Sequence, residues 1–214
     1  MSLSPERAPG RDCPVCPRLV QFREANRRAE PKWHNAPVPS FGPADALLLI
    51  VGLAPGLKGA NRTGRPFTGD FAGDLLYPTL KKFGLAEGEY GRSPEDGFRL
   101  IGCRVSNAVR CVPPENKPTP SEIAGCRSFL IDEIAGLPRL KAILALGNIA
   151  HASVVKALGE SPAKCVFKHG NLHALKGGVL LADSYHCSRY NTNTGRLTTA
   201  MFEAVVGELS RQLA

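Results

Sequence analysis

The 214-residue sequence predicts a single α/β domain, residues 1–214, with a mostly parallel central sheet flanked by helices on both faces. Three observations support this fold class. Short apolar runs of strand length alternate with segments whose apolar residues recur at helical spacing. The composition, 43% hydrophobic and 21% charged, is that of a globular protein. Finally, three loop-like stretches (52–70, 107–117 and 186–196) each follow a predicted strand, so they can converge on one sheet edge.

The first half of the chain is expected to hold one strand and two helices. The N-terminal segment, residues 1–45, contains a short amphipathic helix and then a proline-rich extended stretch. Residues 46–51 form a nearly unbroken apolar run, which predicts a buried parallel strand. A loop rich in Gly and Pro continues to Asp70. From Phe71 the apolar residues recur at helical spacing until Gly84, which predicts a helix.

The middle of the chain repeats this strand–loop–helix pattern. Apolar and polar side chains alternate over residues 98–109, which predicts a second strand. This strand runs into a proline-rich loop. Thr119-Pro120-Ser121-Glu122 is a capping box with proline at the first helical position, so a helix begins there and ends near Gly136. A third strand is expected at 140–146, followed by a helix from Gly147.

The C-terminal part is expected to add a fourth strand and a last helix. Residues 165–175 fit either a strand or a loop. Residues 178–182 are apolar enough for a strand, and Asn191 or Thr194 is expected to cap an amphipathic helix that runs to the C-terminus.

Charge and cysteine content narrow the function. The chain carries 27 Lys and Arg against 19 Asp and Glu, a net charge of +8, which favours nucleic acid as partner, although a basic protein without such a partner would show the same count. We expect no membrane association and a cytoplasmic location, since the N-terminal residues are polar and no apolar segment approaches the length of a span. In that reducing compartment the seven cysteines are unlikely disulfide partners, and their spacing points to metal or catalysis.

Four cysteines form two pairs that predict a metal site. Cys13 and Cys16 form a CxxC pair, and Cys111 is separated from Cys126 by 14 residues. If the fold joins the pairs, they can hold a tetrahedral zinc ion or an iron–sulfur cluster; buried thiols without metal are the alternative. The second pair is too widely spaced for a zinc knuckle. Separately, Cys187 follows His186, and a nearby imidazolium would make that thiol a candidate nucleophile.

Two loop stretches and the four cysteines together carry a family resemblance. Gly52-Leu53-Ala54-Pro55-Gly56 with residues 61–70, and Tyr185-His186-Cys187-Ser188-Arg189 with residues 191–198, resemble the two motifs of the family 5, or type B, uracil-DNA glycosylases. The cysteines match the [4Fe-4S] ligands shared by families 4 and 5. The resemblance runs from Cys13 to the last helix. Two positions depart from related patterns: Cys187 stands where the family usually has proline, and Leu53 stands where family 4 carries an acid.

The resemblance implies an enzyme of base-excision repair. It would hydrolyse the N-glycosidic bond of uracil in DNA, and of other deaminated bases because the pocket lacks a strong acid. No lysine stands where an amine nucleophile is needed, so we expect water attack, a monofunctional reaction and an abasic product. A monomer is expected, with a [4Fe-4S] cluster whose ligands are Cys13, Cys16, Cys111 and Cys126.

The chemistry of excision, carried onto this sequence, gives each site residue a role. His186 would donate a hydrogen bond to the uracil O2 as negative charge develops there. Asp70 would position water or stabilise the sugar cation, or else only cap the following helix. Asn116 or Asn107 would read the uracil edge or hold water. The extruded base would stack on Phe67, and the pocket would be lined by Gly52, Leu53, Ala54, Pro55 and Gly56.

Contacts to the DNA backbone fix register without reading sequence. The residues expected to make them are Arg62, Arg65, Ser188, Arg189 and Arg196. Two other functions are compatible with parts of the sequence. A non-catalytic iron–sulfur module could bind nucleic acid with the same surface, and a zinc-binding nucleotide hydrolase could use the Gly-rich loop, although that loop lacks a Gly-Lys-Ser/Thr ending.

Overall fold

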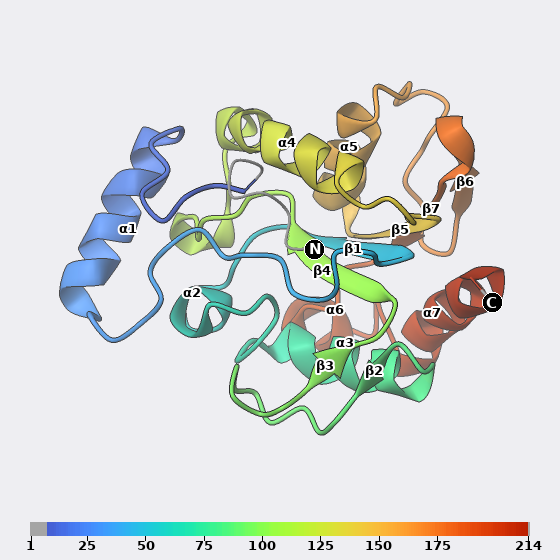
Figure 1. The fold of residues 1–214 in the computed structure, drawn as a ribbon, viewed down its shortest axis with the longest axis horizontal. Coiled ribbons are helices and arrows are strands. Elements are labelled where there is room, and N and C mark those ends of the chain that lie inside the picture. The colour runs from blue at the N-terminus through green and yellow to red at the C-terminus, as the bar shows by residue number, and fades with distance from the viewer. Residues whose placement is uncertain (1–7, 214) are drawn as a thin grey trace.

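The computed structural model describes residues 8–213, and its centre is a five-stranded sheet (Figure 1). The strand order is β4-β1-β5-β7-β6, and only the edge strand β6 runs antiparallel to its neighbour. The strands are β1 (Leu48–Gly52), β4 (Cys103–Asn107), β5 (Ala142–Leu146), β6 (Leu172–Ala174) and β7 (Leu180–Ser184). The predicted fold class, α/β with a mostly parallel sheet, is confirmed.

Helices cover both faces of the sheet because each strand alternates its apolar side chains between two layers (Figure 1). Leu48 and Ile50 of β1 pack in one core with α3 and α7, whereas Leu49 and Val51 pack in the other with α4 and α5. The bounds of these helices are α3 (Phe71–Lys82), α4 (Pro120–Ala135), α5 (Asn148–Ala157) and α7 (Thr199–Leu213).

Short elements complete the described chain. The predicted N-terminal helix is α1 (Pro17–Ala29), which lies beside the layered body (Figure 1). The others are α2 (Ala60–Thr63), β2 (Ala86–Glu87), β3 (Arg99–Leu100), α6 (Arg189–Asn193) and two 3₁₀ turns at Pro114–Asn116 and Lys176–Gly178. Residues 1–7 of the predicted N-terminal segment lie outside the described residues.

Two expectations about element boundaries were wrong. The strand expected at 98–109 is divided, because Gly102 has a φ of +62° and separates β3, which pairs antiparallel with β2, from β4. The last helix is capped by neither Asn191 nor Thr194, which belong to α6 and its end. It begins after Thr198, whose hydroxyl accepts a hydrogen bond from the Met201 N–H at 3.2 Å.

The register of the parallel strands places their carboxyl ends at one level. Gly52 lies opposite Asn107, and Leu146 lies opposite Ser184. The loops after β1, β4 and β7 therefore leave the sheet at the same edge, as the sequence predicted. This alignment is what allows residues far apart in the chain to share one site.

The predicted capping box begins α4 and also fastens α1. The Thr119 hydroxyl accepts from the Glu122 N–H at 3.3 Å, and the Glu122 carboxylate accepts from the Thr119 N–H at 2.7 Å. The same carboxylate binds the Arg18 guanidinium of α1 at 2.7 and 2.8 Å. The N-terminal helix is thereby held against the first turn of α4, and Arg18 also donates to the Lys117 carbonyl at 3.0 Å in the loop before it.

Within residues 8–213, no helix combines the length and the apolar character required to cross a lipid bilayer.

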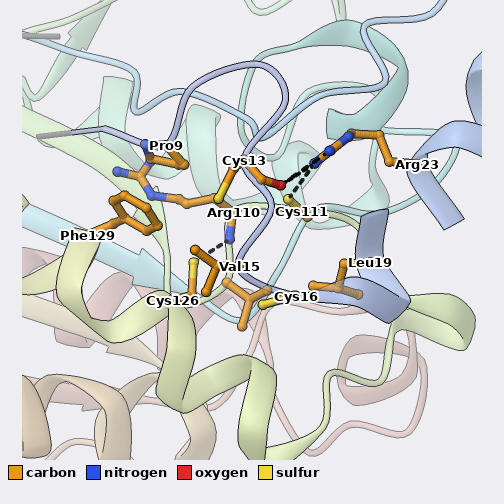
Figure 2. A pocket seen from close by; sticks show the side chains of 11 residues that line it. Pro9, Cys13, Val15, Cys16, Leu19, Arg23, Arg110, Cys111, Cys126 and Phe129 are labelled. Atoms are coloured by element: carbon orange, nitrogen blue, oxygen red, sulfur yellow. Dashed lines mark hydrogen bonds between the residues drawn. The ribbon is translucent and has the colours of Figure 1, made fainter. Parts of the chain in front are cut away.

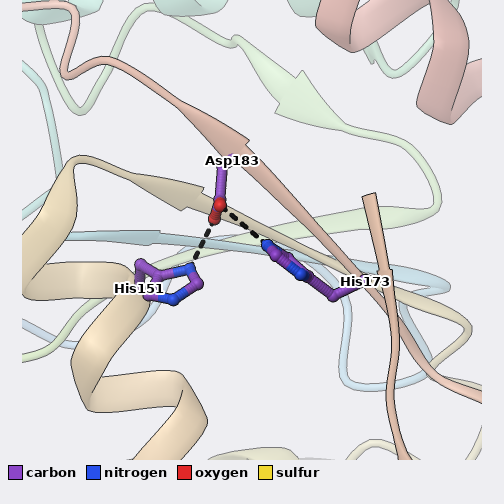
Figure 3. Close-up of side chains that lie close together, drawn as sticks. All are labelled: His151, His173 and Asp183. Atoms are coloured by element: carbon purple, nitrogen blue, oxygen red, sulfur yellow. Dashed lines mark hydrogen bonds and ion pairs between the residues drawn. The ribbon is translucent and has the colours of Figure 1, made fainter. Parts of the chain in front are cut away.

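A buried histidine–aspartate pair joins α5 to the sheet (Figure 3). The Nδ1 of His151 lies 2.6 Å from a carboxylate oxygen of Asp183, and its Nε2 lies 2.8 Å from the carbonyl oxygen of Cys165. A carboxylate and a carbonyl are both acceptors, so the imidazolium form, with a proton on each ring nitrogen, makes both hydrogen bonds. Burial by itself lowers the pKa of His151, but the hydrogen bonds to Asp183 and to the carbonyl outweigh it and raise that pKa. His173 of β6 contacts the second oxygen of Asp183 at 3.0 Å.

The raised pKa of His151 predicts a pH-dependent contribution to stability. That contribution is fully present below the unfolded-state pKa of about 6.5 and is lost as the pH rises through the folded-state pKa. We therefore expect the difference in melting temperature between wild type and His151→Gln to be largest below about pH 6.5 and to shrink above it. Thermal unfolding followed by circular dichroism across this range measures the difference; a constant gap would contradict the charged pair.

Candidate active site and metal centre

A cavity of about 480 Å³ opens at the carboxyl edge of the sheet. It is built from the three stretches that the sequence singled out, and it is large enough to enclose a nucleobase. The residues that line it are Leu53, Ala54, Pro55, Gly56, Phe67, Asp70, Phe71, Ala72, Asn107, Asn116, His186, Ser188 and Arg189. The expectation that these separate loops meet around one space is therefore confirmed by the geometry.

Phe67 sits on a turn that its neighbours hold in an uncommon conformation. Its φ is +56°, which is costly for an aromatic residue and persists only when surrounding contacts fix it. The hydroxyl of Tyr90 donates to the Phe67 carbonyl at 3.1 Å, and the hydroxyl of Tyr77 donates to the carbonyl of Pro66. The ring packs in the main core, where Phe67 is 6% exposed, and it also lines the cavity.

Arg65 supports this turn from inside the protein, so its predicted contact with DNA phosphate is wrong. The residue is only 5% exposed. Two guanidinium nitrogens bind the Asp96 carboxylate at 2.8 and 2.7 Å, and Nε donates to the Thr68 hydroxyl at 2.6 Å. The guanidinium also lies 5.0–5.9 Å from the ring centres of Phe41, Tyr77 and Tyr90. Arg65 is therefore a structural residue of the first loop.

Gly52 allows two site residues to approach the end of β1. A Cβ atom at this position would lie 2.5 Å from both the Asn107 side-chain oxygen and the Phe67 ring. Contacts this short are not tolerated, so any larger residue would displace one or both groups. Gly52 therefore leaves the space that Phe67 and Asn107 occupy, but it does not itself line the cavity.

Asp70 occupies the N-cap position of α3 but its side chain does not cap that helix. The carboxylate turns back toward the first loop and accepts from the Ala60 N–H at 3.2 Å. Glycines at 56 and 59 leave room for it, since a Cβ on either would collide with the carboxylate. Burial raises the pKa of Asp70, while the N–H groups of Ala60 and Gly56 and the charge of Arg62 oppose the rise. The interpretation of the Asp70 side chain as the cap of α3 is therefore wrong.

His186 presents an uncharged ring to the cavity. Burial lowers the pKa of His186 to about 4, because desolvation disfavours the imidazolium. Its ring lies 6.0 Å from that of Phe67, with the two planes 26° from parallel. The side-chain amide of Asn191 donates to the His186 carbonyl at 2.8 Å and fixes the backbone, whereas the ring itself has no hydrogen-bond partner among residues 8–213.

The neighbouring Cys187 is not a nucleophile. Its side chain is fully buried in the core, and burial raises the pKa of the thiol to about 12. The thiolate is therefore not available near neutral pH. Cys187 stands where the resembling family usually has proline, and here its packing in the core fixes the position of the residue.

The two candidate asparagines differ in environment. Asn107 is 3% exposed, and its side-chain oxygen is buried without a hydrogen-bond partner among the described residues. Asn116 is exposed on the 3₁₀ turn after β4, with a φ of +58°, and reaches only the mouth of the cavity. An unpaired buried amide is costly, so Asn107 is the residue that a polar ligand would satisfy.

Three predicted phosphate-binding arginines are on the surface, and Arg189 among them lines the cavity. Arg62, Arg189 and Arg196 are exposed, as a contact with phosphate requires. The Arg189 guanidinium stacks on Phe71 at 5.2 Å, and that of Arg196 stacks on Tyr185 at 4.6 Å. Ser188 lines the cavity and accepts from the Asn191 N–H at 3.4 Å, which begins α6. The sequence analysis did not identify Phe71 as a residue of the cavity wall. An aromatic residue at the first position of a helix, which is usually exposed, could have indicated it.

The four predicted metal ligands line one small pocket between α1 and the β4–α4 connection (Figure 2). Cys13 and Cys16 come from the segment just before α1, Cys111 follows β4, and Cys126 lies in α4. The Cys126 sulfur also receives the Arg110 backbone N–H at 3.4 Å. The fold thus joins the two cysteine pairs, as a shared metal site requires.

The donor set of this pocket fits a thiophilic metal. Burial raises the pKa of Cys16 to about 11 and that of Cys111 to about 12, so as free thiols they keep their protons. A metal reverses this, because it takes the thiolate directly. Four sulfur ligands suit zinc or an iron–sulfur cluster, and the buried guanidinium of Arg23 beside them suits a site with negative charge.

Comparison with known proteins identifies the family. The model of the uracil DNA glycosylase superfamily matches residues 39–210. The chain belongs to this superfamily. It is 46% identical over 205 residues to the type-5 uracil-DNA glycosylase of Thermus thermophilus, with 93% of each chain covered. The type-5 uracil-DNA glycosylase of Pyrobaculum aerophilum is 40% identical over 199 residues, which cover 91% of this chain and 86% of that one.

Similarity to the type-4 branch of the superfamily is weaker. The type-4 uracil-DNA glycosylase of Pyrobaculum aerophilum is 33% identical over 134 residues, 62% of this chain and 60% of that one. The chain is therefore a type-5 member of the uracil-DNA glycosylase superfamily, as its motifs indicated. In this chain, residues of the two resembling motifs line the cavity. Cys13, Cys16, Cys111 and Cys126 line a separate pocket.

The geometry around Gly52 gives a direct test of the cavity. In Gly52→Ala the new methyl group must push the Phe67 ring or the Asn107 amide out of place, so we expect base excision to fall by about tenfold or more. Gly10→Ala is the matched control, because a Cβ there meets no atom within 4 Å. Single-turnover excision rates measure both variants. Normal excision by Gly52→Ala would show that these two groups do not need their observed positions.

Proposed function

We propose that this protein hydrolyses the N-glycosidic bond of uracil, and of other deaminated bases, in DNA as the first step of base-excision repair. The observation that carries the proposal is the meeting of Phe67, Asp70 and His186 in one cavity of a type-5 family member. A stacking ring, a buried acid and an uncharged donor are the groups that such a reaction requires. Membership of the family supports the substrate, and the geometry supports the mechanism.

The base reaches the cavity by leaving the DNA stack, at a cost of roughly a few kcal/mol. Arg62, Arg189 and Arg196 are exposed and hold the DNA phosphates, and Arg189 does so at the cavity itself. Inside, the face of Phe67 replaces part of the lost stacking. The cavity of about 480 Å³ leaves room for a purine as well as a pyrimidine, which supports a range of deaminated bases.

Asn107 reads the edge of the extruded base. Its buried amide has an unpaired oxygen at the cavity wall, and a base N–H would satisfy it. A base without that donor would leave the amide unpaired, at a cost of about 1–3 kcal/mol. Asn116 stands at the exposed mouth, where an amide holds water or a phosphate but does not enclose a base edge.

His186 and Asp70 stabilise the two charges that form as the bond breaks. Neutral His186 donates an N–H to the base oxygen that becomes negative. Its low pKa, about 4, keeps the ring uncharged near neutral pH. Asp70 faces the positive sugar and orients the attacking water, and its raised pKa makes it a stronger base than an ordinary aspartate. No lysine lines the cavity in the described chain, so water is the nucleophile and an abasic site is the product.

The second site is proposed to hold a [4Fe-4S] cluster bound by Cys13, Cys16, Cys111 and Cys126. Its support is the four-sulfur donor set, the buried cation beside it and the resemblance to cluster-containing families. The cluster would supply cross-links and no step of the excision. It would join the segment before α1 to the β4–α4 connection that carries Asn116.

Excision can be tested with an oligonucleotide that contains one uracil. Incubation and then alkali should cut the strand, whereas without alkali the strand should stay whole. His186→Ala should slow excision by about 10²-fold because the oxyanion donor is lost. Lys141→Gln, at the opposite edge of the sheet, is the control and should match wild type. Persistent intact strand after alkali would leave a nucleic-acid-binding module as the better function.

The cluster can be tested through its ligands. Cys126→Ser should lose iron and brown colour and should melt at a lower temperature, because the cross-link between α4 and the N-terminal segment is gone. Cys103→Ser is the matched control, since Cys103 is also buried but lies in the core away from the pocket. Iron and zinc analysis of both proteins decides the metal. If the wild-type protein contains zinc and no iron, the site is a zinc centre and the proposed cluster is wrong.

A further inference from the structure

One arginine is buried against the cysteine pocket (Figure 2). Arg23 lies on the inner side of α1 and is 3% exposed. Its Nη1 is 4.0 Å from the sulfur of Cys111, and both Nη1 and Nη2 lie 3.2 Å from the carbonyl oxygen of Cys13. The guanidinium therefore touches one ligand of each cysteine pair.

Arg23 lacks the partner that the other buried arginines have. Arg65 binds Asp96 and Arg110 binds Glu133, each through direct hydrogen bonds to a carboxylate. Within residues 8–213, the Nε of Arg23 has no hydrogen bond. The carboxylate of Glu24 is 3.9 Å from that Nε, is itself nearly half exposed, and is held at 2.8 Å by another arginine of α1.

A buried guanidinium needs negative charge close by, because burial without compensation strongly disfavours the charged form and arginine does not give up its proton. Neutral thiols cannot supply that charge. Four thiolates around a [4Fe-4S] core can, since the core in its oxidised resting form carries two positive charges against four negative ligands. The pocket then has a net negative charge next to the cation.

We propose that Arg23 is the counter-cation of the cluster, and that its charge both retains the cluster in the protein and favours its reduced form. This inference rests on the proposed cluster but adds a role for a residue outside its four ligands. Arg23 is a positioning and charge-balancing residue; it is not a metal ligand, because guanidinium offers no lone pair.

The charge acts on two measurable properties. It opposes loss of the cluster, because a buried cation close to a site of net negative charge lowers the energy of the loaded pocket. It also favours uptake of one electron, from dithionite or an electrode, since this adds negative charge to the core near the guanidinium. Both effects depend on charge and would survive a change of side-chain shape.

Two substitutions separate charge from hydrogen bonding. Arg23→Gln keeps a donor for the Cys13 carbonyl but removes the charge, whereas Arg23→Lys keeps the charge and one donor group. Arg27→Gln is the matched control. Arg27 lies on the same helix and binds the carbonyl of Arg11 and the carboxylate of Asp12, and within residues 8–213 it makes no hydrogen bond to a sulfur atom.

Release of iron to a chelator, followed as loss of visible absorbance, is the first measurement. We expect Arg23→Gln to release iron about tenfold faster than wild type, with Arg23→Lys and Arg27→Gln close to wild type. The second measurement is the reduction midpoint. A tenfold change in the one-electron equilibrium corresponds to about 59 mV, and Arg23→Gln should shift to more negative potential by about that amount.

The outcomes separate the two hypotheses. If wild type contains no iron, the proposed cluster fails and the inference fails with it, whatever the excision activity. If wild type contains the cluster and Arg23→Gln matches it in release rate and potential, the counter-cation role alone is overturned. If Gln and Lys variants release iron equally fast, Arg23 acts only as a tether of the Cys13 loop, which also overturns the proposal. Circular dichroism confirms that each variant is folded.

Discussion

The cavity depends on a buried ion pair that never touches it. Arg65 and Asp96 bind each other through two hydrogen bonds inside a group of aromatic rings, and this pair holds the loop after β1. The turn at Phe67, with its positive φ, and the placement of Asp70 both rely on that loop. Breaking one partner of a buried pair leaves an uncompensated charge, which costs about 3–5 kcal/mol. The chemistry at the surface is thus supported by electrostatics in the interior.

Much of this arrangement could be predicted from local sequence. Apolar runs such as 46–51 and 140–146 predict strands because a parallel sheet is buried on both faces. Thr119 and Glu122 predict a helix start because both hydrogen bonds of the capping box are made by neighbouring residues. Convergence of the loops follows from parallel strands alone. The cysteine pairs were found by spacing, although only the fold shows that they meet.

The errors arose where distant residues decide the local structure. Arg65 looked like its neighbour Arg62, and only Asp96, 31 residues later, draws it into the interior. Asp70 has the right position to cap α3, but room left by two glycines earlier in the loop turns its carboxylate elsewhere. The sequence left both Asn107 and Asn116 as candidates to read the base edge, and burial separates them. A local sequence pattern does not show whether a distant residue will override the local preference of a side chain.

The seven thiols divide by their access to solvent. Cys103, Cys165 and Cys187 are buried and belong to the two main cores. In the four-cysteine pocket Cys126 is buried, whereas Cys13, Cys16 and Cys111 are partly exposed. Oxidants and alkylating reagents therefore reach Cys13, Cys16 and Cys111 before the three thiols of the main cores, and Cys187, next to the cavity residue His186, is protected. Chemical damage to this molecule would begin at the four-cysteine pocket beside α1, at a place separate from the residues that line the cavity.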